Sequence, residues 1–144
     1  MKNVFLDTNV LLEILCNRRY YKSCEQILMR GKNGYINLFA SFLTFANMAY
    51  VLQREKINRE DIYKAERMME AMMTVLPMDG DQLRAALRNE VKDFEDMLQY
   101  QSALAGHCDC IVTINTNDFV EFSSLPVYSP EGLLDLLDEE SVTS

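Results

Sequence analysis

Short apolar runs alternate with stretches of helical periodicity along the whole chain, and this alternation constrains the fold more than any other feature. The runs are too short to be helices and indicate buried strands. Strands that are joined by helical crossovers form a largely parallel sheet with helices on its faces. We therefore predict an α/β fold. The expected strands are residues 4–6, 35–38, 110–114 and 126–128, with a short extended piece at 76–78.

The stretches between these runs predict helices. Gly31 is expected to end the second of them, and Asn58 is a good N-cap for the fourth. No segment resembles a linker, a repeat or a low-complexity region, so residues 1–144 are predicted to form a single domain. The expected helices begin at residue 8 and then cover 21–30, 41–53, 58–73, 81–90 and 93–105, with a last one starting at residue 130.

The composition is that of a globular protein, with 49% hydrophobic and 25% charged residues. No apolar run approaches the roughly 20 residues of a membrane span, and the N-terminus does not resemble a signal peptide. We therefore expect a cytoplasmic protein without a membrane partner. Residues 129–144 hold five acids and no Lys or Arg, whereas the rest of the chain has 17 acids against 14 bases. Charge alone thus gives no support for tight, non-specific binding to nucleic acid.

The four cysteines, Cys16, Cys24, Cys108 and Cys110, are expected to be free thiols, because no secretion signal accompanies them. His107 completes a local cluster with the last two. A structural zinc site usually has four ligands with wider spacing, so this cluster does not indicate zinc. His107 is also the single histidine, which counts against catalysis by a Ser-His-Asp or Cys-His arrangement.

Polar segments follow the two most strand-like runs. Asp7, Thr8 and Asn9 follow the first run, and residues 115–119 follow the run at 110–114. The ligand crevice of an open parallel sheet lies outside the carboxyl ends of its strands. If the two strands are neighbours, Asp7, Asn115 and Asp118 converge there. The alternative is that Asp7 only caps the following helix.

A third acidic segment opens the helix at 93–105. Asp93 and Asp96 are three residues apart and share one face of this helix, which is otherwise apolar and must pack inside. The alternative is that both acids only favour the helix dipole. Carboxylates that cluster in one crevice stay ionised only when a cation joins them. Ligation by oxygen alone favours Mg²⁺ or Mn²⁺ over zinc, and such ions support phosphodiester chemistry.

Four segments, taken in order, resemble the PIN-domain family. They are VFLDTNVLL at 4–12, SFLTFANMAYVL at 41–52, DFEDMLQYQSALA at 93–105 and IVTINTNDF at 111–119. In size and architecture the chain is similar to the VapC-type toxins of bacterial toxin–antitoxin pairs. The resemblance implies a three-layer α/β/α sandwich with a central, mostly parallel sheet. It also implies a ribonuclease that depends on Mg²⁺ or Mn²⁺.

The resemblance also implies which residues form the site. Asp7 matches the first metal-binding acid, and Asp96 matches the acid of the central helix, with Asp93 as an additional candidate beside it. The acid of the last motif falls at the position of Asn115 or of Asp118. We therefore predict Asp7, Asp93, Asp96 and Asp118 as metal ligands, with Asn115 as a further catalytic group.

Supporting polar residues are implied at Thr8, Asn9 and Thr113, which match positions that orient acids or water. One departure concerns Asn47, which stands where the family usually has a glutamate. Its amide can ligate through oxygen or orient water, but it carries no charge. Glu13 on the first helix is a less favoured substitute.

The resulting hypothesis is a metal-dependent endoribonuclease that acts as a toxin and is held inactive by an antitoxin. The alternative is a weakened PIN-like module that binds RNA or a protein partner without cleavage, as the uncharged Asn47 suggests. A phosphatase of the haloacid-dehalogenase type is disfavoured, because Asn9 stands where that family needs an aspartate. The Met-rich stripe at 68–73 indicates core packing or a dimer face, with an adaptable partner surface as the alternative, and we expect a homodimer.

Overall fold

The computed structural model describes residues 1–143, and it confirms an α/β fold with three layers. Ser144, which belongs to the predicted domain, lies outside the described residues. The strands are β1 (Lys2–Leu6), β2 (Ile36–Ser41), β3 (Thr74–Leu76), β4 (Cys110–Val112) and β5 (Val127–Tyr128). The helices are α1 (Thr8–Leu15), α2 (Tyr21–Lys32), α3 (Phe42–Arg54), α4 (Arg59–Met72), α5 (Gly80–Arg88), α6 (Phe94–Ala105), α7 (Asn117–Val120) and α8 (Pro130–Thr143).

The five described strands form one sheet in the order β3-β2-β1-β4-β5, and every neighbouring pair is parallel. The central strand β1 pairs with β2 on one side and with β4 on the other. Leu6 lies opposite Val112, and the backbone N–H of Asp7 donates to the carbonyl of Val112 at 3.0 Å. The segments that follow β1 and β4 therefore leave the sheet side by side at one edge.

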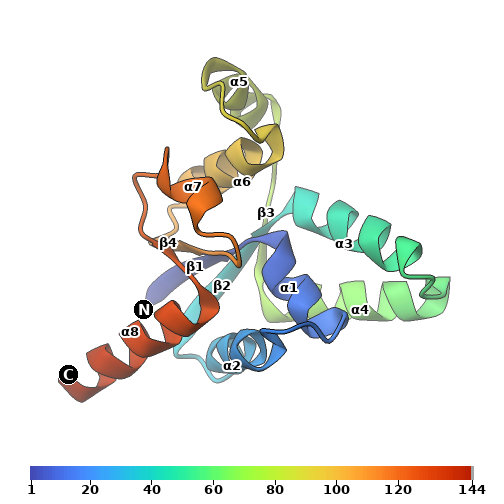
Figure 1. The fold of residues 1–144 in the computed structure, drawn as a ribbon, viewed down its shortest axis with the longest axis horizontal. Coiled ribbons are helices and arrows are strands. Elements are labelled where there is room, and N and C mark those ends of the chain that lie inside the picture. The colour runs from blue at the N-terminus through green and yellow to red at the C-terminus, as the bar shows by residue number, and fades with distance from the viewer. Residues whose placement is uncertain (144) are drawn as a thin grey trace.

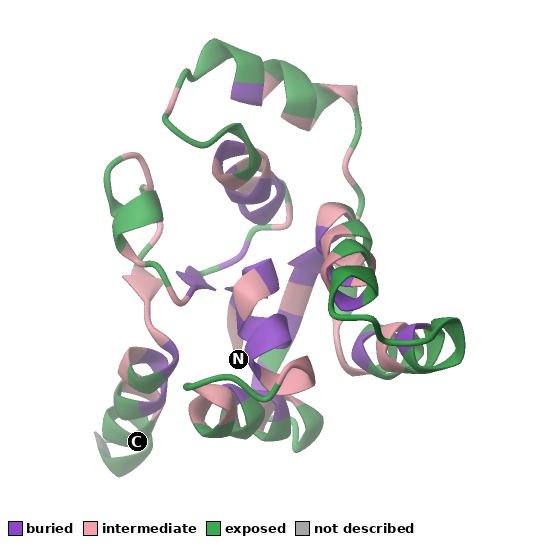
Figure 2. Ribbon diagram, turned by 45° about the vertical axis from the view of Figure 1, so that its right-hand side comes forward, coloured by how far each residue is buried: buried purple, intermediate pink, exposed green. Residues whose placement is uncertain are grey.

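Helices cover both faces of the sheet because successive strand residues point to opposite sides. Val4 and Leu6 face a core cluster to which α1, α2, α3, α4 and α8 contribute. Phe5 and Ile111 face a second cluster with side chains of α5, α6 and α7. Figure 1 shows these two groups of helices on either side of the strands, and Figure 2 shows that the buried residues gather on the strands and on the helix faces nearest to them.

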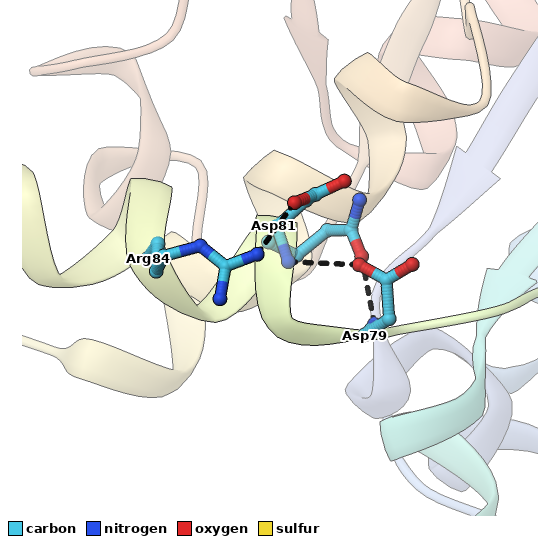
Figure 3. Close-up of polar contacts among 4 residues, drawn as sticks. Asp79, Asp81 and Arg84 are labelled. Atoms are coloured by element: carbon cyan, nitrogen blue, oxygen red, sulfur yellow. Dashed lines mark hydrogen bonds and ion pairs between the residues drawn. The ribbon is translucent and has the colours of Figure 1, made fainter.

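Helix α5 illustrates how local sequence sets a helix start. Asp79 is its N-cap, and its carboxylate accepts from the N–H of Asp81 at 2.8 Å, while its own N–H donates to the Gln82 side chain. Arg84 then pairs with Asp81 one turn along the helix at 2.7 Å (Figure 3). This capping arrangement satisfies backbone groups that a helix terminus leaves without partners.

The prediction that Gly31 ends the second helix is wrong, because α2 continues through Gly31 to Lys32. Gly31 lies against Leu38 of β2, and a Cβ atom there would overlap that side chain. The glycine thus serves close packing of the helix on the sheet. The extended piece expected at 76–78 lies two residues earlier in β3, and α7 was not predicted from the sequence.

The four cysteines are free, as predicted, and Cys24, Cys108 and Cys110 are buried. Most of the Met-rich stripe also packs inside, since Met69 is fully buried and Met68 alone of its members is largely exposed. None of the helices within residues 1–143 combines the length and the hydropathy that a membrane span requires.

Candidate active site

A pocket of about 340 Å³ lies at the edge of the sheet where β1 and β4 end. It is lined from α1, α3, α6 and the segment after β4. Its acidic lining residues are Asp7, Asp93, Glu95, Asp96 and Asp118, and its amide residues are Asn9, Asn47 and Asn115. No Lys or Arg in the described part of the chain lines it. Two larger hollows, of about 650 and 680 Å³, lie along α3 and α4 and contain none of these acids.

Asp7 forms the floor of the pocket and is only 7% exposed. It is the N-cap of α1, and its carboxylate accepts from the N–H of Thr8 and from the hydroxyl of Thr113, both at 2.9 Å. Burial raises the pKa of Asp7 to about 6, although both hydrogen bonds act in the opposite direction. Capping and a place in the pocket are therefore compatible roles for this residue, and its negative charge is costly in the absence of a cation.

The first turn of α6 brings three more acids. Asp93 is the N-cap and accepts from the N–H of Asp96 at 3.2 Å, while both side chains line the pocket. Burial, and then repulsion from Asp93 and the other acids of the pocket, raises the pKa of Asp96 to about 7. The carboxylates on this helix thus lie close enough to Asp7 to disturb one another's ionisation.

The segment after β4 completes the pocket. Thr113 is fully buried beneath it, and its hydroxyl accepts from the N–H of Asn115 at 3.2 Å while donating to Asp7. Asn9 of α1 accepts from the N–H of Ile114 at 3.4 Å, which ties the two polar segments together. Asn115 and Asp118 are exposed and line the rim.

A buried polar network lies below the pocket. The side-chain amide of Gln99 donates to the hydroxyls of Thr44 at 2.9 Å and Thr8 at 3.1 Å, and Ser41 donates to the Gln99 side-chain oxygen. All four residues are buried, with Ser41, Thr44 and Gln99 fully so. This network joins α1, α3 and α6, three of the helices that carry residues of the pocket. Thr8, predicted as a supporting residue, belongs to it.

Asn47 lines the pocket from α3, and its side-chain amide donates to Glu95 at 2.7 Å. Glu95 was not predicted as a site residue from the sequence. Its place beside Asp96 in the first turn of a helix was the available signal, but a sequence does not show which first-turn acids face a neighbouring helix. Glu13 lies elsewhere: it is buried and accepts from the N–H of Tyr20 at 2.8 Å, so it does not substitute for Asn47 in the pocket.

The chemistry of the pocket suits a hard divalent cation. Its side-chain donors are carboxylate, amide and hydroxyl oxygens, the class of ligand that Mg²⁺ and Mn²⁺ prefer. Within residues 1–143, no three His, Cys, Asp or Glu side chains are arranged to enclose a metal ion. Mg²⁺ does not need such an enclosure, because it usually keeps several waters and takes only one or two carboxylates.

Residues 3–117 match the model of a family described as PIN domain. A search of curated proteins gave no significant match.

Among solved structures, the chain is similar to the VapBC2 complex from Rickettsia felis bound to a promoter DNA fragment. That match has a TM-score of 0.68 and 15% identity, and covers 88% of this chain and 98% of that one. For VapBC-1 from nontypeable Haemophilus influenzae, the TM-score is 0.66 with 17% identity, covering 90% and 98%. For a toxin–antitoxin complex from Klebsiella pneumoniae, it is 0.65 with 19% identity, covering 88% and 97%. Because the sequence identities are this low, the similarity to these structures shows a shared fold alone.

Proposed function

The chain belongs to the PIN-domain family, and we propose that it is a metal-dependent endoribonuclease that serves as the toxin of a toxin–antitoxin pair. The observation that carries this proposal is the pocket, which is lined by acids from the end of β1, from α6 and from the segment after β4, and by no Lys or Arg of the described residues. The toxin–antitoxin complexes among the structural neighbours support an antitoxin as the partner.

In this proposal Asp7, Asp96 and Asp118 hold Mg²⁺ or Mn²⁺, with Asp93 beside them at the rim. The bound ion supplies a water of lowered pKa and positive charge against the phosphate oxygens. The Thr8 N–H and the Thr113 hydroxyl fix the orientation of the Asp7 carboxylate, while its remaining lone pairs stay available.

The amides have orienting roles. Asn115 lies at the rim, where its side chain is proposed to orient the attacking water or the phosphate. Asn9 holds the backbone after β4 through its bond with Ile114, which keeps the two polar segments in register. Substrate binding itself should require the cation, because the acids of the pocket repel phosphate and, among residues 1–143, no Lys or Arg lines this pocket.

A second candidate is a PIN-like module that binds RNA or a protein without cleaving it. The observation in its favour is the uncharged Asn47, which leaves α3 without a carboxylate in the pocket. The two candidates differ in their need for metal. A nuclease of this design binds RNA only with Mn²⁺ or Mg²⁺, whereas the module binds its partner equally well in EDTA.

We also propose that residues 1–144 form one domain, because both apolar clusters share one sheet. An RNA substrate and an antitoxin partner would be met in the cytoplasm. A homodimer would use exposed apolar side chains of α3 and α4, among them Phe42, Tyr63 and Met68.

The test is cleavage of a defined RNA pool by the purified protein with Mn²⁺, Mg²⁺ or EDTA, together with RNA binding under the same conditions. Asp96→Asn removes one carboxylate of the pocket, and Asp135→Asn removes an exposed one on α8 as the matched control. We expect metal-dependent cleavage that is lost only in Asp96→Asn. Cleavage that is equal in all three proteins would overturn the assignment. RNA binding that persists in EDTA, with no cleavage in Mn²⁺ or Mg²⁺, would favour the module.

A further inference from the structure

Helix α3 brings no carboxylate to the pocket. Its residues, Phe42–Arg54, include no Asp or Glu, and Asn47, Tyr50 and Val51 are what it contributes to the lining. Any acid on this side of the pocket must therefore reach it from another element. Glu95 of α6 does so, because it lines the same pocket and accepts a 2.7 Å hydrogen bond from the Asn47 amide.

Two side-chain hydrogen bonds connect α3 and α6, and together they explain why Asn47 pairs with Glu95. The first joins Thr44 to Gln99 at 2.9 Å and is fully buried. The second joins Asn47 to Glu95 and is exposed to solvent. Positions 44 and 47 are three apart on α3, and positions 95 and 99 are four apart on α6, so each pair shares one helix face. The buried hydrogen bond between Thr44 and Gln99 fixes the register between the two helices, and this register places Glu95 opposite Asn47.

The Glu95 carboxylate keeps capacity for a ligand. In the described residues, the Asn47 amide is the only hydrogen-bond donor to its side chain. An ionised carboxylate offers about four lone-pair sites, so one bond leaves most of them available. Glu13, the other glutamate considered for this role, is already committed to the Tyr20 backbone outside the pocket.

We propose that Glu95 is a further metal-binding carboxylate of the pocket and that Asn47 is the positioning residue that holds it there. The inference rests on the proposed function above, since it concerns the same metal site. Glu95 on α6 then provides the negative charge that α3 does not supply. Asn47 acts through its side-chain N–H group, which donates to Glu95, and not through its oxygen.

The test measures Mn²⁺ affinity by calorimetry on the full chain, without RNA. Glu95→Gln removes the charge, yet its side-chain oxygen still accepts from Asn47. Glu90→Gln removes another exposed charge, five residues earlier and outside the pocket, which controls for long-range electrostatics. We expect the Kd for Mn²⁺ to rise about tenfold or more in Glu95→Gln and less than about twofold in Glu90→Gln.

Asn47→Ala tests the positioning role, because it keeps the Glu95 charge but removes the donor that holds it. We expect a rise in the Kd of about three- to tenfold. The double variant Asn47→Asp with Glu95→Gln reverses the bridge, since the amide then stands on α6 and the carboxylate on α3. It should recover most of the affinity that Glu95→Gln loses, whereas a purely structural role would give no such recovery.

The outcomes separate this inference from the proposed function. Wild type that binds Mn²⁺ with Glu95→Gln unchanged would overturn the role of Glu95 and leave the proposed function intact. Wild type that binds no Mn²⁺ would overturn both. Thermal unfolding of each variant in EDTA shows whether it is folded. The inference is supported if Glu95→Gln is folded but loses Mn²⁺ affinity, and if the double variant restores that affinity.

Discussion

Replacing Asp7 with Asn should make the protein more stable at neutral pH, and this gain should shrink in acid. Asp7 is 7% exposed, and its carboxylate lies among other acids, with Thr8 and Thr113 as its hydrogen-bond donors. Asn has nearly the same shape and still accepts from the Thr8 N–H. It carries no charge, so it avoids the cost of holding an anion in this place.

The size of the effect follows from the pKa of Asp7, which burial raises from 3.8 to about 6. The folded state therefore binds the proton more tightly than the unfolded state. Stability is greatest below the unfolded pKa and is lost as the pH rises from about 4 to about 6. The difference between the two pKa values corresponds to about 3 kcal/mol at neutral pH, of which about 2 kcal/mol develops between pH 4.5 and 7.5.

The assay is urea unfolding of wild type and Asp7→Asn in EDTA at these two pH values. Fixed differences between the side chains, such as a changed bond with Thr113, cancel when the two pH values are compared. The advantage of the Asn variant should be about 2 kcal/mol larger at pH 7.5 than at pH 4.5. Asp135→Asn, which removes an exposed acid on α8, serves as the control for general charge effects.

An advantage of Asp7→Asn that is equal at both pH values would refute this reasoning, because it would show that burial does not disturb the ionisation of Asp7. An advantage that grows toward acid would contradict its sign. In either case the cost of ionised Asp7 could no longer be used to argue that the pocket favours a cation.

Three further perturbations test other parts of the structure. Mn²⁺ at a hundred times its Kd should raise the free energy of unfolding of wild type by about 2.7 kcal/mol in urea at pH 7.5. Metal binding in the pocket is refuted if Mn²⁺ stabilises Asp96→Asn, which lacks a pocket acid, by the same amount. Gln99→Leu should cost about 2–4 kcal/mol, because it breaks three buried hydrogen bonds and leaves the Ser41 hydroxyl without its acceptor; a loss below about 1 kcal/mol in the same assay would show that the network is dispensable. Gly31→Ala should cost about 1–3 kcal/mol because its Cβ overlaps Leu38, and an unchanged unfolding midpoint would show that the sheet yields to it.

The layered fold was predictable because buried strands produce apolar runs in the sequence and because polar residues follow the carboxyl ends of these strands. The cores of β1 and β4 read as uninterrupted apolar runs, as expected for strands that are covered on both faces. The polar residues after both runs indicated the ligand edge of the sheet, and the pairing of β1 with β4 does bring Asp7 and Asp118 into one pocket. The catalytic roles assigned to these residues stay predictions.

Gly31 shows where local rules give the wrong answer. A glycine near the end of an amphipathic stretch is a common helix terminator, since it readily takes the left-handed conformation. Here the helix continues, and the missing side chain instead makes room for Leu38. The left-handed residue after α6 is His107 with φ 55°, in a position where glycine is the usual choice. Packing against a distant strand decides between these uses, and the sequence around a glycine does not contain that information.

The uncharged Asn47 illustrates the same limit at the candidate site. Considered by position alone, it subtracts a ligand from α3 and weakens the case for a metal-dependent enzyme. Its amide instead donates to Glu95 on another helix, 48 residues away in sequence. The pairing depends on the register between α3 and α6, which the buried contact of Thr44 with Gln99 fixes. The charge of a pocket is set by the side chains that converge in space, so an amide at one position is compatible with a full set of acids when its neighbour across the pocket is a carboxylate.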